Sequence, residues 1–144
     1  MTLSIDTDAP PPILPARVWV WHRKSGRFLF DPTSVTLWLP SEQKEETGIK
    51  GIRLQKEVEV HRPMNGAVLK SLLRNQDEIP FEWKSLRPCF WGTRYKNLKG
   101  NLVIPYLSFI EEKDEWQCHT KLVGDMFTSE YPALVASPLE LNTK

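Results

Sequence analysis

Residues 86–122 read LRPCFWGTRYKNLKGNLVIPYLSFIEEKDEWQCHTKL, a stretch of apolar segments divided by polar turns. The apolar segments, rich in β-branched and aromatic residues, are Leu86–Tyr95, Leu102–Ile110 and Trp116–Leu122. Such runs between short polar turns are typical of β-strands that pair with their neighbours in the chain. We therefore predict a three-stranded antiparallel meander, and Pro105 predicts a bulge or a local edge in the middle strand.

A second pair of β-prone runs lies upstream, where Val18–His22 and Arg27–Phe30 flank the turn Lys24-Ser25-Gly26. Two such runs around a Gly-containing turn predict a hairpin. Because alternate strand residues point to opposite faces, its two tryptophans share one face and its two valines share the other. With both faces apolar, the hairpin is either buried on both sides or presents its aromatic side chains to a partner.

The rest of the chain predicts further strands and a helix. Strands are expected at Ser34–Leu39 and at Ile52–Val60, the latter half-exposed because apolar and charged residues alternate along it. Gly66–Arg74 is predicted to be a helix because its apolar residues recur at helical spacing. Asn65 is a suitable N-cap, and Asn75 is expected to end the helix in the left-handed conformation.

Together these patterns predict an α+β fold, mainly antiparallel β, in a single small domain with one short helix packed on the sheet. We place this domain at residues 17–137, where the segment Tyr131–Ser137 is expected to pack back on the sheet. Residues 1–16 hold four prolines and no periodic apolar pattern, so we expect a disordered, Pro-rich leader there. Residues 138–144 are expected to form a flexible tail.

Composition bounds the functions that the chain suits. Its formal net charge is +1, so no global field attracts nucleic acid or a membrane surface. The first residues lack the basic and apolar regions of a signal peptide, and no apolar run approaches the ~18–20 residues of a membrane span. We therefore expect a cytoplasmic protein with no membrane partner. The six tryptophans are many for this length, and tryptophan is favoured both in cores and in interaction hot spots.

Several stretches in the second half of the chain carry a resemblance to other proteins. They are Ile79–Lys84, Phe90–Tyr95, Gly100–Leu107 and Tyr131–Ser137. The chain resembles a group of short uncharacterised bacterial proteins that share a Trp-rich strand, a Gly turn, a Val-x-Tyr-Leu-type strand and a terminal Pro-Ala-Leu segment. The resemblance implies a bacterial origin and a compact domain. Because no activity is attached to that group, the resemblance assigns no catalytic or binding residue.

The side chains that could ligate a metal do not show the spacing of a known metal site. They are His22, His61, His119, Cys89 and Cys118. No pair has zinc-finger spacing, and Cys118 and His119 are neighbours that point to opposite faces of a strand. We expect no metal and no cofactor.

The two cysteines are expected to be free thiols. If the meander is paired as predicted, each of its hairpins places a cysteine opposite Ser108 on the middle strand. Two strand spacings then separate Cys89 and Cys118 by about 9–10 Å, whereas a disulfide needs Cα atoms within about 7 Å.

Motifs of catalysis are missing from the sequence. It contains neither a nucleophile elbow nor a Gly-rich phosphate-binding loop. A catalytic group assembled from distant parts of the chain remains open, because such groups depend on geometry in space. We therefore lean towards a protein that is not an enzyme and keep an unrecognised small enzyme as the third hypothesis.

A basic and aromatic segment supports the second hypothesis. Between Trp83 and Ile110 there is no acidic residue. The basic residues of this window are Lys84, Arg87, Arg94, Lys96 and Lys99. Basic residues among aromatics on a sheet can neutralise phosphates and stack bases, so nucleic-acid binding by the meander at 84–109 is our alternative. The net charge of +1 argues against a dedicated nucleic-acid-binding protein.

Our leading hypothesis is a non-catalytic protein-interaction domain, which binds another protein or a second copy through an exposed aromatic patch or a sheet edge. The candidate patch consists of Trp19, Trp21, Phe28 and Phe30. These side chains supply more aromatic surface than a short hairpin usually buries. The alternative is that the predicted helix Gly66–Arg74, whose apolar stripe has a matching width, covers them.

Overall fold

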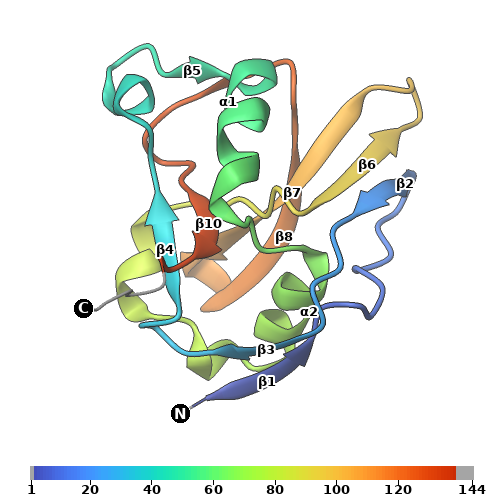
Figure 1. The fold of residues 1–144 in the computed structure, drawn as a ribbon, viewed down its shortest axis with the longest axis vertical. Helices are drawn as coiled ribbons and strands as arrows, with labels where there is room; N and C mark the ends of the chain where they lie inside the picture. Colours follow the sequence, from blue (N-terminus) through green and yellow to red (C-terminus); the bar gives the residue numbers. More distant parts are fainter. Residues whose placement is uncertain (1, 139–144) are drawn as a thin grey trace.

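The computed structural model describes residues 2–138 and confirms the predicted α+β fold (Figure 1). Antiparallel sheets predominate in a single small domain, and two helices pack on them rather than one. The strands are β1 (Leu3–Asp6), β2 (Arg17–His22), β3 (Arg27–Phe30), β4 (Val35–Trp38), β5 (Ile49–Lys50), β6 (Thr93–Asn97), β7 (Leu102–Ile110), β8 (Glu115–Leu122), β9 (Met126–Phe127) and β10 (Ala133–Ala136). The helices are α1 (Gly51–Val58) and α2 (Gly66–Arg74). Short 3-10 turns lie between these elements, and they are η1 (Ser41–Lys44), η2 (Glu59–His61), η3 (Gln76–Glu78), η4 (Phe81–Ser85) and η5 (Glu111–Lys113).

The largest sheet among the described residues has the strand order β2-β6-β7-β8, with neighbouring strands antiparallel. Figure 1 shows the long β7–β8 ribbon crossing the molecule, with β6 and then β2 beside it. The predicted meander is thus confirmed, and β7 has the predicted bounds. Its first strand, β6, is shorter than the predicted Leu86–Tyr95, and upstream of it Cys89 forms isolated bridges to Tyr106 of β7 and to Ala133 of β10.

Strand β7 is buried on both faces. Leu107 belongs to a core cluster that contains Leu69 of α2. Ile104 belongs to a second cluster that contains Leu54 of α1 and Phe127 of β9. Because residues an odd number apart on a strand point to opposite faces, the two helices pack on opposite faces of the sheet. Burying each of these large apolar side chains contributes about 1.5–3 kcal/mol.

Helix α2 forms where the sequence predicts it, and its N-cap links several segments. The Asn65 side-chain oxygen accepts hydrogen bonds from the main-chain N–H groups of Ala67 and Val68, at 3.0 and 3.3 Å. Its amide nitrogen donates to the carbonyl oxygens of Thr7 and Arg23, at 2.9 and 2.6 Å. The buried Asn65 therefore joins the helix to the N-terminal segment and to the chain that follows β2.

The predicted left-handed end of α2 is wrong. Asn75 has a φ of −135° and a ψ of 57°, and its main-chain N–H donates to the carbonyl oxygen of Leu72. This backbone bond closes the last turn of the helix, so a left-handed residue is not needed to satisfy that carbonyl group.

The strand predicted at Ile52–Val60 is also wrong, because most of this segment forms α1. Leu54 and Val58 are both fully buried in the second core cluster. Ile52 and Val60, which strict alternation also marks as inward-facing, are 61% and 80% exposed. A spacing of four fits one face of a helix and one face of a strand equally well, so the apolar pattern did not distinguish the two.

The hairpin predicted at 18–30 is wrong as well. Strand β2 pairs with β6, and β3 pairs with β1, so the two runs do not pair with each other. The main-chain N–H of Arg23 donates to the carbonyl oxygen of Gly92 at 2.7 Å, which keeps the chain beside the β6 side of the molecule after β2 ends. Each of the two runs therefore pairs with a strand from elsewhere in the chain and not with its neighbour across the turn.

The leader that we expected to be disordered forms regular structure. Leu3–Asp6 is strand β1, and its Ile5 is 4% exposed within the first core cluster. Further along the leader, the Tyr95 hydroxyl donates to the carbonyl oxygen of Pro12 at 2.7 Å. The prediction is wrong because a segment with few apolar residues can still form a strand when a partner strand and a core are available to it.

The return of the C-terminal segment to a sheet is confirmed. Within Tyr131–Ser137, strand β10 pairs antiparallel with β4, which lies inside the predicted strand Ser34–Leu39. Of the tail expected at 138–144, residues 139–144 lie outside the part of the chain that the structure describes.

We predict that Asn65→Ala lowers the free energy of unfolding by roughly 2–4 kcal/mol, because it removes an N-cap and leaves one buried and one part-buried carbonyl group without the hydrogen bond from its amide. Urea denaturation followed by circular dichroism measures the change. The matched control is Asn75→Ala at the other end of α2, where the exposed side chain donates to the carbonyl oxygen of Ser71 at 2.8 Å. We expect a loss below about 1 kcal/mol there. Equal losses in the two variants would contradict the linking role of Asn65.

Candidate functional site

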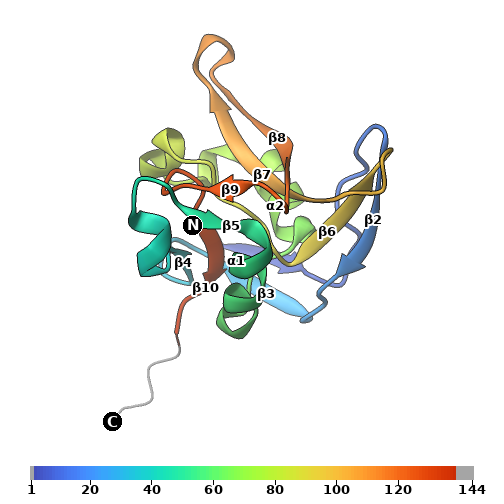
Figure 2. The same ribbon diagram turned by 90° about the horizontal axis from the view of Figure 1, so that it is seen from above.

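Strand β2 forms one edge of the four-stranded sheet, and β8 forms the other. Among the described residues β2 pairs with β6 on one side and with no strand on the other, at the margin of the molecule (Figure 2). The backbone hydrogen bonds that residues 17–23 make outside this ladder lie at its two ends, to the carbonyl oxygens of Leu14 and Gly92. The outer side of β2 therefore presents backbone groups with which another strand could pair.

A run of apolar residues on β2 is exposed. Val18 is 68% exposed, Trp19 43%, Val20 48% and Trp21 37%. We call Val18–Trp21 the β2 edge. A strand at the side of an antiparallel sheet usually packs one of its faces inward, so exposure on both faces is a mark of an interaction surface. Helix α2 does not cover the two tryptophans, because its apolar residues pack in the core.

The other half of the predicted aromatic patch does not belong to this surface. Phe30 is 1% exposed in the first core cluster, and Phe28 packs against the same cluster. Both lie on β3, which pairs with β1 and not with β2. The patch was predicted as one surface because a hairpin was expected, and it is wrong for these two phenylalanines for the same reason.

A β-bulge at Val20 separates the surroundings of the two tryptophans. Trp19 is paired with Tyr95 and Trp21 with the adjacent Arg94, so Val20 has no partner on β6. An extra residue of this kind interrupts the alternation of side chains along a strand. The two tryptophans, which strict alternation places on one face, therefore have different neighbours.

Arg94 is held between a ring and a carboxylate. Its guanidinium carbon lies 4.1 Å from the centre of the Trp21 ring, within the range of a cation–π interaction. Its Nη2 donates to Glu59 Oε1 at 2.8 Å. Only 13% of the Arg94 side chain is exposed, and among the described residues its buried Nε has no hydrogen-bond partner.

A polar network fixes the C-terminal end of β2 from within. His22 Nε2 lies 2.8 Å from the carbonyl oxygen of Ala9, and its Nδ1 lies 2.7 Å from Thr93 Oγ1. The carbonyl oxygen of Ala9 can only accept, so Nε2 is the ring nitrogen that donates here, and in the neutral imidazole Nδ1 accepts from the Thr93 hydroxyl. Thr93 Oγ1 also accepts the N–H of Gly66 at 2.6 Å. Burial lowers the pKa of His22 below its ordinary value.

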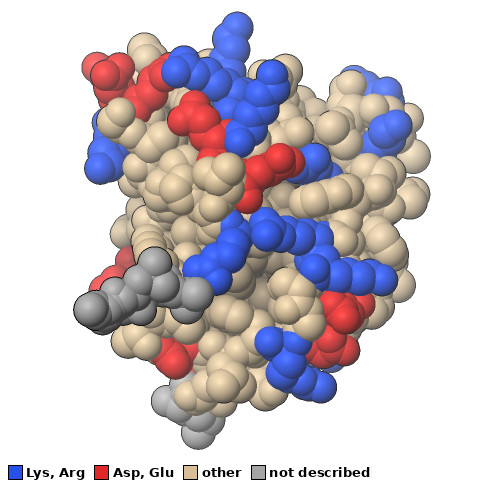
Figure 3. Space-filling view, viewed as in Figure 1, with Lys and Arg blue, Asp and Glu red and all other residues tan. Residues whose placement is uncertain are grey.

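Basic residues flank the β2 edge at both ends. They are Arg17, Lys96 and Lys99 at the N-terminal end, and Arg23, Lys24 and Arg94 at the C-terminal end. Three of them belong to the five basic residues that the sequence singled out. The others lie in residues 17–30, which contain no Asp or Glu, a signal that could have identified them. Figure 3 shows Lys and Arg side chains in a band across one face and around the β6–β7 turn.

The remaining two predicted basic residues lie elsewhere. Lys84 is on η4, with its Nζ 4.9 Å from the centre of the Phe81 ring and 4.4 Å from that of Phe109. Arg87 forms an ion pair with Glu130 at 3.2 Å. The structure therefore does not gather the five basic residues into one surface.

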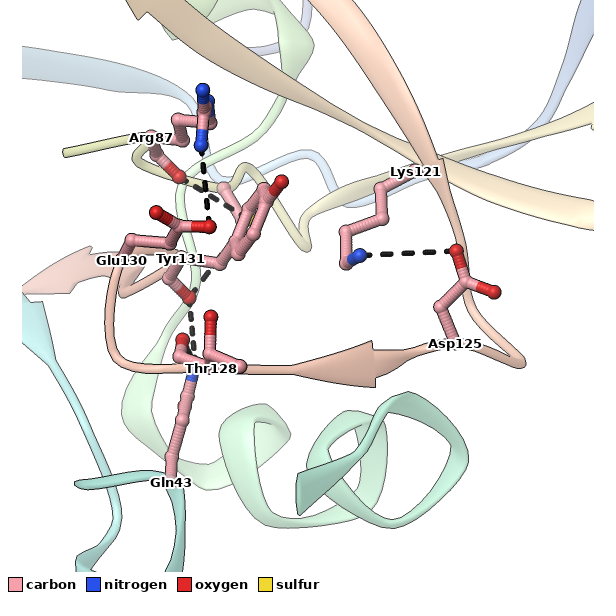
Figure 4. Close-up of polar contacts among 8 residues, drawn as sticks. Gln43, Arg87, Lys121, Asp125, Thr128, Glu130 and Tyr131 are labelled. Carbon is pink, nitrogen blue, oxygen red and sulfur yellow. Dashed lines mark hydrogen bonds and ion pairs between the residues drawn. The ribbon is translucent and has the colours of Figure 1, made fainter. Parts of the chain in front are cut away.

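A second polar cluster surrounds Tyr131, in the connection between β9 and β10 (Figure 4). The ring lies between Arg87, whose guanidinium carbon is 5.6 Å from its centre, and Lys121, whose Nζ is 4.5 Å from it. Glu130 pairs with Arg87 at 3.2 Å, and Asp125 pairs with Lys121 at 3.8 Å. Because neighbouring carboxylates already engage both cations, the cluster serves to hold this connection against the sheet.

Gln43 fixes the same connection from the other side. This fully buried residue donates its amide nitrogen to the carbonyl oxygens of Thr128 and Tyr131, at 3.0 and 2.7 Å (Figure 4). Among the described residues its Oε1 has no hydrogen-bond partner. Sequence reasoning missed Gln43, because a single glutamine in a charged loop carries no signal of burial.

Both cysteines are free thiols. The register differs from the one we predicted, because Cys118 pairs with Leu107 and Cys89 bridges Tyr106, so neither lies opposite Ser108. Burial raises the pKa of Cys118 to about 12. Burial also raises the pKa of Cys89. Both sulfurs are therefore protonated near pH 7 and are poor nucleophiles.

Within residues 2–138, no group of three or more His, Cys, Asp and Glu side chains is arranged to hold a metal ion. In the same part of the chain, no helix combines the length and the apolar character that crossing a membrane requires. Comparisons with family models, curated proteins and solved structures gave no match. The function is therefore argued from the geometry of the chain itself.

We predict that His22 makes the protein less stable as the pH falls below about 6.5, the usual pKa of an unfolded histidine. Because the pKa of His22 is lowered in the folded state, the unfolded state binds the proton more readily. The free energy of unfolding should therefore decrease between pH 7.5 and pH 5.5, and decrease less in His22→Asn. Urea denaturation across this range measures the slope. The control is His119→Asn, at an exposed position on β8, which should keep the wild-type slope.

We predict that Gln43→Glu destabilises the protein by about 3 kcal/mol or more, because it buries a carboxylate against two carbonyl oxygens. Gln43→Met keeps the volume without the charge and should cost less, roughly 1–3 kcal/mol. The same charge change on α1, Gln55→Glu, should stay within about 0.5 kcal/mol. Urea denaturation ranks the three variants. An equal loss in Gln43→Glu and Gln55→Glu would show that Gln43 does not fix the connection.

Proposed function

We propose that this protein is a non-catalytic protein-interaction domain that binds its partner along the β2 edge. The observation that carries the proposal is the exposure of Val18–Trp21 on a strand whose outer side is unpaired among the described residues. Keeping apolar surface in water costs about 25 cal/mol per Å² relative to burying it. A partner that covers this surface gains that free energy.

The binding mode that fits this edge is strand addition. An extended segment of the partner pairs its backbone with the outer side of β2, and its side chains cover the exposed apolar residues. Proteins usually protect such edges with charged residues or proline, and Val18–Trp21 contains neither. The bulge at Val20 interrupts pairing at one position, so the partner pairs on either side of it.

Single-stranded nucleic-acid binding is the second candidate, and one observation favours it. Lys96, which pairs with Val18, and Lys99, in the turn after β6, form no ion pair among the described residues. Base stacking, however, needs an open ring face, and the guanidinium of Arg94 lies over the ring of Trp21. Protein binding is therefore the better supported of the two.

A cytoplasmic location is part of the same proposal. One buried and one half-buried free thiol suit a reducing compartment, because extracellular proteins more often pair their cysteines. The bacterial origin implied by the resemblance to short bacterial proteins stays a prediction.

The proposal predicts that Val20→Lys abolishes peptide binding without unfolding the protein, since a lysine on an edge strand blocks pairing and Val20 is 48% exposed. A random-peptide display library is selected on the wild type, and the enriched peptides are then tested against the variants. Ile52→Lys is the matched control, because Ile52 is 61% exposed on α1, away from β2.

The expected result is retention by the wild type and by Ile52→Lys, with loss on Val20→Lys. If Val20→Lys retains every enriched peptide as well as the wild type does, the β2 edge is not the binding surface and the proposal is wrong. Tight binding of single-stranded oligothymidylate that weakens steeply with salt favours the second candidate instead.

A further inference from the structure

The N-terminal end of the β2 edge carries positive charge that the fold does not neutralise. Arg17 donates its Nε–H to Thr120 Oγ1 of β8 and its Nη1 to the carbonyl oxygen of Pro15, both at 2.8 Å, so its guanidinium lies toward β8 and not on the outer side of β2. Lys96 on β6 and Lys99 in the turn after it are exposed. Within residues 2–138, none of these three cations forms an ion pair with a carboxylate.

The C-terminal end is positive as well. Arg23 donates to the main-chain carbonyl oxygen of Glu59 at 3.4 Å. The carboxylate of Glu59 forms an ion pair with Arg94 and not with Arg23. Lys24 is exposed. Asp8 also lies near this end, and its carboxylate accepts the N–H of Gly26 at 3.0 Å. Within residues 2–138, neither Arg23 nor Lys24 forms an ion pair with a carboxylate.

The spacing of the two ends defines a length. Arg17 and Arg23 enclose the apolar β2 edge and the residue after it, and an extended strand of this size spans about 20 Å. Because β2 has one extra residue at Val20, a partner strand covers the same distance with about one residue fewer. The partner therefore needs its charged groups at the two ends of an apolar centre of about four residues.

A second copy of this chain does not fit that pattern. Antiparallel pairing of β2 with β2 of another copy, centred on Val20, brings the N-terminal end of each edge, with Lys96 and Lys99, near the C-terminal end of the other, with Lys24. Like charges directly across a strand pair destabilise it, and here the repulsion occurs at both ends. Single-stranded nucleic acid fits less well, because Val18 and Val20 at the centre of the surface provide no ring on which bases could stack.

We propose that the occupant of the β2 edge is an extended segment of another protein whose apolar centre is flanked at both ends by Asp or Glu residues. This inference rests on the proposed function and specifies its partner. Backbone pairing with β2 and burial of the apolar centre supply the affinity. The flanking carboxylates meet the two cationic ends, which selects acidic partners and speeds their association.

Synthetic peptides with a common centre of alternating Val and Thr test the charge requirement. They carry two Glu, two Gln or two Lys at each end, and the full-length protein is titrated with each by calorimetry. We expect the Glu-flanked peptide to bind at least about tenfold more tightly than the Lys-flanked one, with the Gln-flanked peptide between them. The difference should shrink as salt is added, because the charges are exposed.

A variant that removes charge only at exposed positions tests the same requirement without disturbing the fold. Lys24→Gln combined with Lys96→Gln removes one exposed cation from each end and should weaken binding of the Glu-flanked peptide by about threefold or more, leaving the Gln-flanked peptide unchanged. The matched control is Lys56→Gln, an exposed lysine on α1, which should leave both affinities unchanged.

The outcomes separate the two proposals. If the Gln-flanked and Glu-flanked peptides bind equally and Val20→Lys abolishes both, binding at the edge stands and the acidic partner is wrong. If no peptide from the library or from synthesis binds in a way that depends on Val20, the proposed function itself is wrong. A wild-type dimer in light scattering that Val20→Lys converts to a monomer identifies a second copy as the occupant and overturns the acidic partner.

Discussion

The burial of β7 on both faces is the constraint on which the rest of the structure depends. A strand with no solvent-facing side needs a packed layer above it and another below it. Helix α2 with β1 and β3 supplies one layer, and α1 with β5 and β9 supplies the other. Strand β2 lies two positions from β7 in the sheet, at its outer edge. Its apolar residues stay exposed because these layers do not extend over them.

The exposed strand is nevertheless firmly held. The end of β2 is tied to the N-cap of α2 through Asn65, and to β6 and the leader through His22 and Thr93. These bonds fix one side of the strand and leave its outer side unpaired among the described residues. A partner that adds to a strand already in its bound conformation loses less conformational entropy than one that must order it, and this favours binding.

The elements predicted most accurately are those whose apolar periodicity and end residues can be recognised within the segment itself. Strand β7 and helix α2 carry their own periodicity and end signals, and both lie within the predicted bounds. The prediction of a hairpin failed because β3 pairs with Leu3–Asp6, and the short apolar pattern of that segment does not indicate a strand. Helix α1 was predicted as a strand because the spacing of its buried residues Leu54 and Val58 fits the periodicity of a helix and that of a strand. For the site, the sequence identified the tryptophans of β2, but the bulge at Val20 depends on the register with β6, which no local pattern encodes.

The pairing of β4 with β10 also sets a limit on when the chain can finish folding. The hydroxyls of Thr36 and Ser137, 101 positions apart in the chain, lie 3.0 Å from each other at the end of this pair. At a synthesis rate of about 5–20 residues per second, roughly 5–20 s pass between the appearance of one strand and that of its partner. Throughout that interval the ribosome-bound chain holds β4 without its ladder, and long-range pairing of this kind also closes slowly. Completion of the native sheet is therefore an event of the nearly finished polypeptide, and a nascent chain stalled before β10 is an incompletely folded substrate for chaperones and proteases.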